Sequence, residues 1–347
     1  MVNVGTRRTS PDDHPADVHF PDDHPVAVHL PDDHLSDVLR HVEIHGVISG
    51  GLVARAPWVS RGEVTDDVKI VAVLRGRAHL RTDGGASAHL TEGDVAVLRH
   101  RTWLALRGGS PHGTAREIAP PVGWSARPLD ASGQSDVVIG GHVHLGPAAR
   151  ELLHPALPPV GHLHGSDPAA RRLRTVLGLL LEEFSGGEPG SGFALAQYAQ
   201  LLMLETLRAY AARPDLPPGW LRLLADERLR PAVRLMHDDP GRPWRLEQLA
   251  RAATMSRTAF AESFRRTSGF TPFAYLHRWR IVLAEHALRH TDTSVDALAA
   301  RLGYASPTSF STAFRRTVGM PPSAYRRARR TAPTSGAAPA VGRRARL

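Results

Sequence analysis

The sequence predicts an α+β protein with a small antiparallel β-barrel in its N-terminal half and an all-α domain in its C-terminal third. Three observations support this fold class. A 12-residue segment is repeated near the C-terminus, short alternating strands fill residues 35–165, and two amphipathic helices occupy residues 166–212. The 347 residues are enough for two or three domains, each with its own core.

The repeated segment begins at Phe264 and begins again at Phe314, with identical residues at eight of twelve positions. The shared residues are Phe, Arg, Arg, Thr, Gly, Pro, Ala and Tyr, in the same order in both copies. Such agreement in register indicates an internal structural repeat and not a bias of composition.

Each copy is predicted to contain two helices. The first helix has apolar residues at i, i+3, i+4 and i+7, and the second copy repeats this stripe in register. These residues are Leu246, Leu249, Ala250, Ala253, Val295, Leu298, Ala299 and Leu302. The second helix begins after a capping serine, Ser256 or Ser306, and ends at Gly269 or Gly319. Helix, tight turn and helix make a helix-turn-helix unit, so the sequence predicts two such units joined by a long helix.

The segment from about residue 226 to 330 resembles the DNA-binding domain of AraC/XylS-type transcription regulators. That family ends each unit in Phe, two basic residues, Gly, Pro and Tyr, as both copies do here. Leu298–Tyr304 is similar to the family's second unit ahead of its recognition helix. Arg280–Leu288 is similar to the family's connecting helix, with Ala287 replacing one of its paired apolar residues. The resemblance implies a sequence-specific DNA-binding transcription regulator, an activator or a repressor, with double-stranded DNA as partner and RNA polymerase as a candidate partner.

The resemblance also implies which residues meet DNA. By position, the base-facing residues are Thr258, Ala261 and Glu262 in the first unit and Pro307, Thr308, Ser309 and Thr312 in the second. Phosphate contacts would come from Arg257, Arg265, Arg266, Arg315 and Arg316. The alternative for the arginine pairs is a solvated helix face. The first unit departs from the family at Arg245, where a capping Ser or Thr is usual.

Positive charge is concentrated in the repeats. The chain carries a net charge of +9, and residues 226–330 alone hold 19 arginines against 9 acidic residues. The segment 331–347 adds three arginines, so the part of the chain before position 226 is net negative. This distribution is typical of a phosphate-binding domain attached to a partner domain of different charge. Lys69 is the sole lysine, which indicates a GC-rich genome more than selection for arginine.

Composition excludes several classes of protein. The absence of cysteine excludes disulfides, thiolate zinc sites and cysteine nucleophiles. Because no apolar run approaches the length of about 20 residues that a membrane-spanning helix needs, we expect no membrane partner and a cytoplasmic protein. Residues 1–34 contain Pro-Asp-Asp-His three times at regular spacing, and we expect a disordered extension there, with metal binding as the alternative. Residues 331–347 are predicted to be a disordered basic tail.

The strands predicted over residues 35–165 follow closely on one another. Val68–Leu74 is an apolar run, and the segments around Leu80 and Leu90 alternate across a turn at Asp83–Gly85. Gly93 and Asp94 then turn into another apolar strand. This spacing favours a β-sandwich or small barrel, and the stretch resembles the cupin-like sensor barrel of many AraC-type regulators. Such a barrel implies a small-molecule effector, for which Trp58, Trp103 and Trp124 could line a cavity.

Some cupins are metal-dependent enzymes, and their metal site needs His-x-His with a nearby Glu and a further His. Where the first motif is expected, only His79 is present. His142 and His144, like His162 and His164, have the spacing that places both rings on one face of a strand, but no Glu at the required offset. We therefore expect no cofactor, no metal and no catalytic residue. A metal-dependent cupin enzyme fused to a DNA-binding domain remains the alternative, and an effector-independent DNA-binding protein is another.

Two helices are predicted between the barrel and the repeats. Residues 169–184 and 193–212 each place leucines on one face, and a Gly-rich turn between them favours an antiparallel pair. In the family such helices often form a homodimer contact, and packing on the barrel alone is the alternative. Residues 213–225, with three prolines, are predicted to be the linker to the DNA-binding domain.

Overall fold

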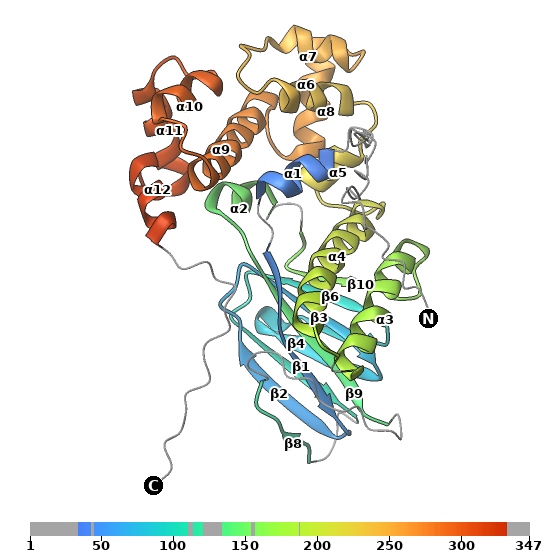
Figure 1. Cartoon of the computed structure of the whole chain (residues 1–347). Coiled ribbons are helices and arrows are strands. Elements are labelled where there is room, and N and C mark those ends of the chain that lie inside the picture. The colour runs from blue at the N-terminus through green and yellow to red at the C-terminus, as the bar shows by residue number, and fades with distance from the viewer. Residues whose placement is uncertain are drawn as a thin grey trace, which may run out of the picture. The chain divides into compact units, whose positions relative to one another are not determined.

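The structure is a computed structural model that describes residues 34–42, 45–109, 114–120, 134–153, 157–186 and 188–331 (Figure 1). The predicted N-terminal extension and the basic tail lie outside these residues, apart from His34 and Thr331. Within the described part, no helix is both long enough and apolar enough to cross a membrane.

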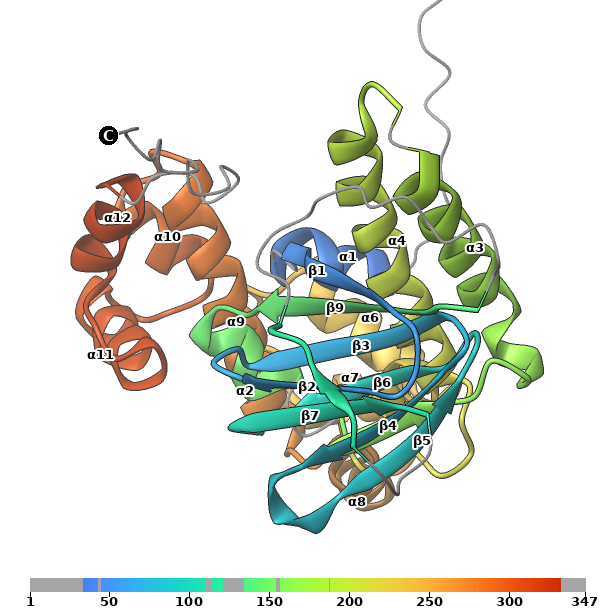
Figure 2. The ribbon, with the colours of Figure 1, turned by 90° about the horizontal axis from the view of Figure 1, so that it is seen from below.

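Residues 45–163 form two five-stranded sheets that face each other (Figure 2). The first sheet has the order β1 (His45–Ala54), β9 (Asp136–His144), β3 (Val68–Arg75), β6 (Val95–Arg99) and β10 (Val160–Leu163). The second has the order β5 (Ser87–Thr91), β4 (Arg77–Thr82), β7 (Trp103–Gly108), β2 (Trp58–Glu63) and β8 (Arg116–Glu117). Neighbouring strands are antiparallel, except β2 and β8. The predicted two-sheet barrel is confirmed.

Alternation along the first sheet produces two apolar cores. In β6, Ala96 and Leu98 face the second sheet, whereas Val95 and Val97 face the helices. Trp58 closes the core between the sheets, and its indole Nε1 donates a hydrogen bond of 2.8 Å to the Asp136 carboxylate. The other Asp136 oxygen accepts from the Arg77 amide at 3.0 Å, so this buried carboxylate joins both sheets.

The two predicted central helices are confirmed as α3 (Arg171–Gly186) and α4 (Ser191–Ala211), which lie side by side (Figure 1). Their buried leucines, among them Leu177 and Leu202, pack on the outer face of the first sheet together with Val97. Burial on the sheet therefore accounts for one face of each helix.

Several elements differ from the sequence prediction. Residues 34–42, expected to open the barrel, form helix α1 (His34–Val42), and α2 (Pro147–Leu153) lies between the last two strands. The second half of the predicted linker is helix α5 (Trp220–Ala225), whose Trp220 and Leu223 side chains are buried. All three helices are too short for the apolar repeat of a helix to be recognised in the sequence.

The C-terminal helices reproduce the predicted double unit. They are α6 (Arg230–Asp238), α7 (Leu246–Ala252), α8 (Arg257–Ser268), α9 (Pro272–His290), α10 (Val295–Arg301), α11 (Pro307–Val318) and α12 (Pro322–Thr331). The first helix-turn-helix is α7 with α8, the second is α10 with α11, and α9 connects them (Figure 1). Both units lie where the repeat predicted them.

Candidate nucleic-acid interface

The second helix of each unit is fixed at both ends by the predicted caps. Ser256 Oγ accepts a hydrogen bond from the Ala259 amide at 3.3 Å, and Ser306 Oγ accepts one from the Ser309 amide at 3.1 Å. At the other end, Gly269 and Gly319 have φ values of 79° and 86°. This left-handed conformation ends a helix at little cost only when the residue is glycine.

Aromatic packing on the inner side is also duplicated. Phe260 and Phe264 have ring centroids 5.6 Å apart, and Phe264 meets Tyr275 edge-on at 5.6 Å. In the second copy the corresponding distances are 5.8 Å for Phe310 and Phe314 and 5.5 Å for Phe314 and Tyr325. Since all these rings are buried, they orient α8 and α11 and leave the opposite faces of both helices outward.

The outward faces carry the residues predicted to meet DNA. Eleven of the twelve are exposed, and Ala261 is half-buried. The exposed residues are Arg257, Thr258, Glu262, Arg265, Arg266, Pro307, Thr308, Ser309, Thr312, Arg315 and Arg316. The structure thus gathers each predicted set on one accessible helix face.

The paired arginines at the ends of α8 and α11 are not equivalent. Arg266 donates to Ser263 Oγ at 3.3 Å, and an Arg316 nitrogen lies 3.2 Å from His277 Nε2. Burial, followed by the charge of Arg316, lowers the pKa of His277 and favours its neutral form. Among the described residues, the guanidinium groups of Arg265 and Arg315 have no hydrogen-bond or ion-pair partner. Of the four paired arginines, these two are therefore the more available for an anion.

Two capping details refine the sequence interpretation. Ser309 Oγ accepts from the Ser306 amide at 3.2 Å and donates to the Ser306 carbonyl at 2.8 Å. The Ser309 hydroxyl thus holds the start of α11. At the start of α7, where Arg245 replaces a capping hydroxyl, the Gln248 side chain accepts from the Arg245 amide at 2.9 Å. The Arg245 amide at the start of α7 therefore has an acceptor, although no hydroxyl side chain caps this helix.

The turns of the two units have the same hydrogen bonds at equivalent positions of the repeat. Met255 N–H donates to Ala250 O at 2.9 Å, and Tyr304 N–H donates to Ala299 O at 3.0 Å. Gly303 has φ 71°, and its counterpart Thr254 has φ 54°. A β-branched residue in this region is strained, so the first turn is held against its local preference.

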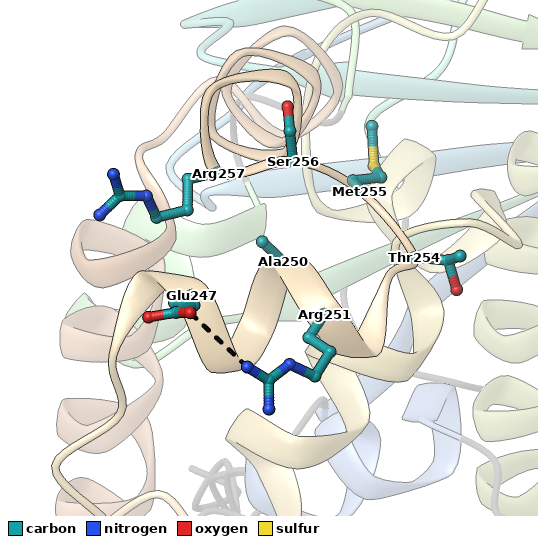
Figure 3. A pocket seen from close by; sticks show the side chains of 7 residues that line it. All are labelled: Glu247, Ala250, Arg251, Thr254, Met255, Ser256 and Arg257. Atoms are coloured by element: carbon teal, nitrogen blue, oxygen red, sulfur yellow. Dashed lines mark ion pairs between the residues drawn. The ribbon is translucent and has the colours of Figure 1, made fainter.

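A depression of about 740 Å³ lies on the outer surface between α7 and the start of α8 (Figure 3). Its lining is mostly polar and comprises Glu247, Ala250, Arg251, Thr254, Met255, Ser256 and Arg257. Glu247 and Arg251 form an ion pair of 3.5 Å, whereas Arg257 points away from both in Figure 3. The depression belongs to the first helix-turn-helix and not to the barrel.

Arg280 on α9 connects the two helix-turn-helix units, and its guanidinium contacts the loop that precedes α7. Its Nε donates to Pro240 O at 2.6 Å, a second nitrogen donates to Arg242 O at 3.3 Å, and its guanidinium lies 5.9 Å from the Tyr304 ring centroid. The same loop touches the second turn backbone to backbone, because a Cβ built on Gly303 would be 2.0 Å from Gly241 O. The sequence placed Arg280 in the connecting helix, but nothing in it indicated this joining role.

Trp58 and Trp103, two of the candidate effector residues, lie at opposite ends of the β2–β7 pair. Trp58 is fully buried in the core, Trp103 is 40% exposed, and Trp124 lies outside the described residues. Of the histidines weighed for a metal, His79 stacks on His89 at a centroid distance of 4.2 Å, and His142 Nδ1 lies 3.9 Å from Asp66. The side chain of His144 lies outside the described part.

A two-sheet barrel followed by two outward-facing helix-turn-helix units defines the class of DNA-binding transcription regulators with a cupin domain. Comparison with known proteins agrees: the "Cupin" family model matches residues 33–212, and the "Helix-turn-helix domain" model matches residues 249–328. The chain belongs to the family of AraC-like transcription regulators.

Some of its relatives match most of its length. An AraC-like transcription regulator of Streptomyces lividans is 35% identical over 279 residues, covering 78% of this chain and 90% of that protein. The RCS-specific HTH-type transcriptional activator RclR of Escherichia coli is 30% identical over 234 residues, covering 66% and 76%. The crystal structure of the DNA-binding domain of AdpA in complex with a target DNA is 35% identical, covering 30% of this chain and 95% of that one, with a TM-score of 0.29.

Proposed function

We propose that α8 and α11 are the recognition helices and that their outward residues contact duplex DNA. One observation supports this proposal. The predicted contact residues are exposed on the same face of α8 and α11, and both helices have a serine N-cap and a glycine C-cap. A recognition helix reads base edges through residues of its N-terminal half. Thr258, Ala261 and Glu262 meet bases in the first unit, and Pro307, Thr308 and Thr312 do so in the second. Ser309 lies on the same helix face, but its hydroxyl is engaged in the N-cap and is therefore less available for a hydrogen bond to a base.

The arginines supply affinity in this proposal. Arg265 and Arg315 contact phosphates directly, and Arg257, Arg266 and Arg316 contribute to the same cationic surface. Both proposed helices are poor in Arg, Asn and Gln at base-facing positions, which are the residues that read guanine or adenine with two hydrogen bonds. Glu262 can accept from cytosine, and the methyl groups of Thr and Ala can meet thymine.

Replacing Arg265 or Arg315 by alanine should weaken DNA binding for all sequences and flatten its salt dependence. Each phosphate contact releases counterions, so each variant should make the negative slope of log K against log salt shallower by about one. Fluorescence anisotropy with labelled promoter DNA from about 50 to 200 mM salt measures the slope.

Arg234 provides the matched control, because it is an arginine of the same domain on α6 that pairs with Asp238 at 3.5 Å. Arg234→Ala should leave the slope unchanged. Equal slopes for Arg265→Ala, Arg315→Ala and the wild type would refute the phosphate assignment.

We also propose a homodimer formed through α4. Its buried face packs on the barrel, yet Phe193 and Leu201 on the outward face are 75% and 42% exposed. Leu201→Arg should therefore shift the protein from dimer to monomer in sedimentation velocity, because a buried charge would oppose association. Thr65→Arg adds the same charge at an exposed position between β2 and β3, away from α4, and should remain dimeric. A dimeric Leu201→Arg variant, or a monomeric wild type, would contradict the proposal.

We infer further that the barrel senses a small-molecule effector and that the protein is a regulator and not an enzyme, working in the cytoplasm where its DNA is found. The relatives are transcription regulators, which supports this. Two contacts between α2 and α9 support this proposal: the Ala148 amide donates to the buried Glu285 carboxylate at 3.2 Å, and Glu151 lies 3.5 Å from Arg278. An effector that moves α2 would act on α9, and RNA polymerase would be the partner that reads the result.

A further inference from the structure

Three metal-ligating side chains meet at one edge of the barrel, remote in sequence from the DNA-binding helices. Asp94 precedes β6, while His162 lies in β10 and His164 directly follows that strand. Their donor atoms all lie within 4.8 Å of one another. The Asp94 carboxylate is 3.0 Å from His162 Nε2, and the two imidazole rings have centroids 3.9 Å apart.

The register of the sheet explains this convergence. In the antiparallel pair of β6 and β10, His162 lies opposite Ala96 and Leu163 lies opposite Val95. Opposed residues share a face, so His162 lies on the barrel-facing side, and the next residue pair on that side is Asp94 with His164. β10 is the edge strand of its sheet, which leaves His164 exposed and one side of the cluster open.

The carboxylate is held in place by its surroundings. The Gly165 amide donates to one Asp94 oxygen at 2.7 Å, and the Thr91 amide and hydroxyl donate to the other at 2.9 and 3.1 Å. The backbone is tightly packed here, since a Cβ on Gly165 would lie 2.7 Å from the carbonyl carbon of Gly93. Hydrogen bonds from neighbouring groups to a ligating side chain, such as these, orient the ligands of metal sites.

We propose that Asp94, His162 and His164 bind a divalent cation of borderline softness, Zn²⁺ being the representative ion. Two imidazoles and one carboxylate are a set that such ions prefer, and ligands about 2.0–2.2 Å from one metal lie close to the separations found here. Water would complete the coordination on the open side. The nearby Arg174 guanidinium donates to the carbonyls of Gly165 and Asp167, so its charge is engaged with the backbone.

The sequence indicated His162 and His164 as a candidate pair of metal ligands but did not indicate Asp94 as the third ligand. A histidine pair at this spacing calls for a carboxylate a few residues away, whereas Asp94 lies far upstream, before a different strand. The Gly93–Asp94 turn was recognised only as the start of a strand. None of the helix-turn-helix residues belongs to this site, so a test of metal binding is independent of the proposed DNA contacts.

Zinc titration of the full chain tests the proposal. The N-terminal repeats carry His14, His24 and His34 beside aspartates, so these three are first changed to glutamine to remove a competing source of binding. In that background, competition with a chromogenic chelator should give one Zn²⁺ per chain. His164→Gln should weaken binding at least about 10-fold, and His162→Gln with His164→Gln more than about 100-fold.

The controls separate loss of a ligand from loss of the fold. His79→Gln with His89→Gln removes a stacked pair elsewhere in the barrel and should leave zinc affinity unchanged. His164 is exposed, so His164→Gln should fold normally, and zinc should raise the melting temperature of the background but hardly that of this variant. Absence of stoichiometric zinc in the background, or unchanged affinity in the double variant, would overturn the site.

Discussion

Replacing Gly303 by alanine should destabilise the DNA-binding helices more than any other single-methyl change in the turns. Its φ of 71° is unfavourable for alanine by about 1–2 kcal/mol. The added Cβ would also lie 2.0 Å from Gly241 O, a backbone atom that cannot rotate away, and such overpacking costs about 1–3 kcal/mol more. We expect a loss of about 3 kcal/mol in the free energy of unfolding.

Gly319→Ala is the matched control, because it has a similar φ of 86° but nothing within 4 Å of the added Cβ. It should lose only the conformational part, about 1–2 kcal/mol. Urea denaturation followed by far-ultraviolet circular dichroism compares the two variants. Similar losses at both positions would show that the contact between the Gly241 and Gly303 backbones contributes nothing.

Replacing Arg280 by methionine should separate the two helix-turn-helix units without unfolding either of them. Methionine keeps much of the apolar stem but leaves the carbonyls of Pro240 and Arg242 without their donor. Hydrogen bonds to a charged group contribute about 1.5–3 kcal/mol, so affinity for DNA that spans both units should fall about 10-fold to 100-fold. Anisotropy titrations with duplexes that span one unit or both measure this.

Arg278→Met controls for the loss of an arginine from the same helix. Arg278 donates to Ala274 O within α9 at 3.2 Å, lies over the Phe270 ring at 4.3 Å and pairs with Glu151 of α2 at 3.5 Å, so its contacts differ from those that Arg280 makes to the 240–242 loop. Its removal should leave the spacing of the units unchanged. If Arg280→Met weakened binding to single-unit and double-unit duplexes equally, the joining role of Arg280 would be rejected.

The repeat was the part of the fold that sequence could predict best. Its caps at Ser256, Ser306, Gly269 and Gly319 are local signals, readable within a few residues, and all four lie where expected. The strands around Leu80 and Leu90 were likewise predicted, because a half-buried strand alternates visibly. By contrast β1, with glycines at 46, 50 and 51, has no such alternation, so the sequence placed it within the predicted β region without giving its bounds.

Contacts between distant segments were beyond sequence reasoning. Gly241 and Gly303 are separated in sequence by helices α7, α8, α9 and α10, and Asp94 and His162 are separated in sequence by strands β6, β7, β8 and β9, yet each pair is in contact. Neither Gly241 nor Asp94 belongs to a periodic sequence pattern that would indicate which distant residue it contacts. The candidate DNA contacts were predictable as a set because the family motif fixes them by position. The engagement of Ser309 in a cap and of Arg316 with His277 required the folded chain.

The duplicated scaffold has a consequence for what the protein can recognise. The inner aromatic rings and caps match between copies, but the outward residues diverge, with Arg257 and Glu262 in one copy where Pro307 and Thr312 stand in the other. Two copies of one scaffold thus present outward helix faces that differ in charge. Under the proposed assignment of these faces to DNA, the two stretches of promoter that a single molecule contacts need not resemble each other.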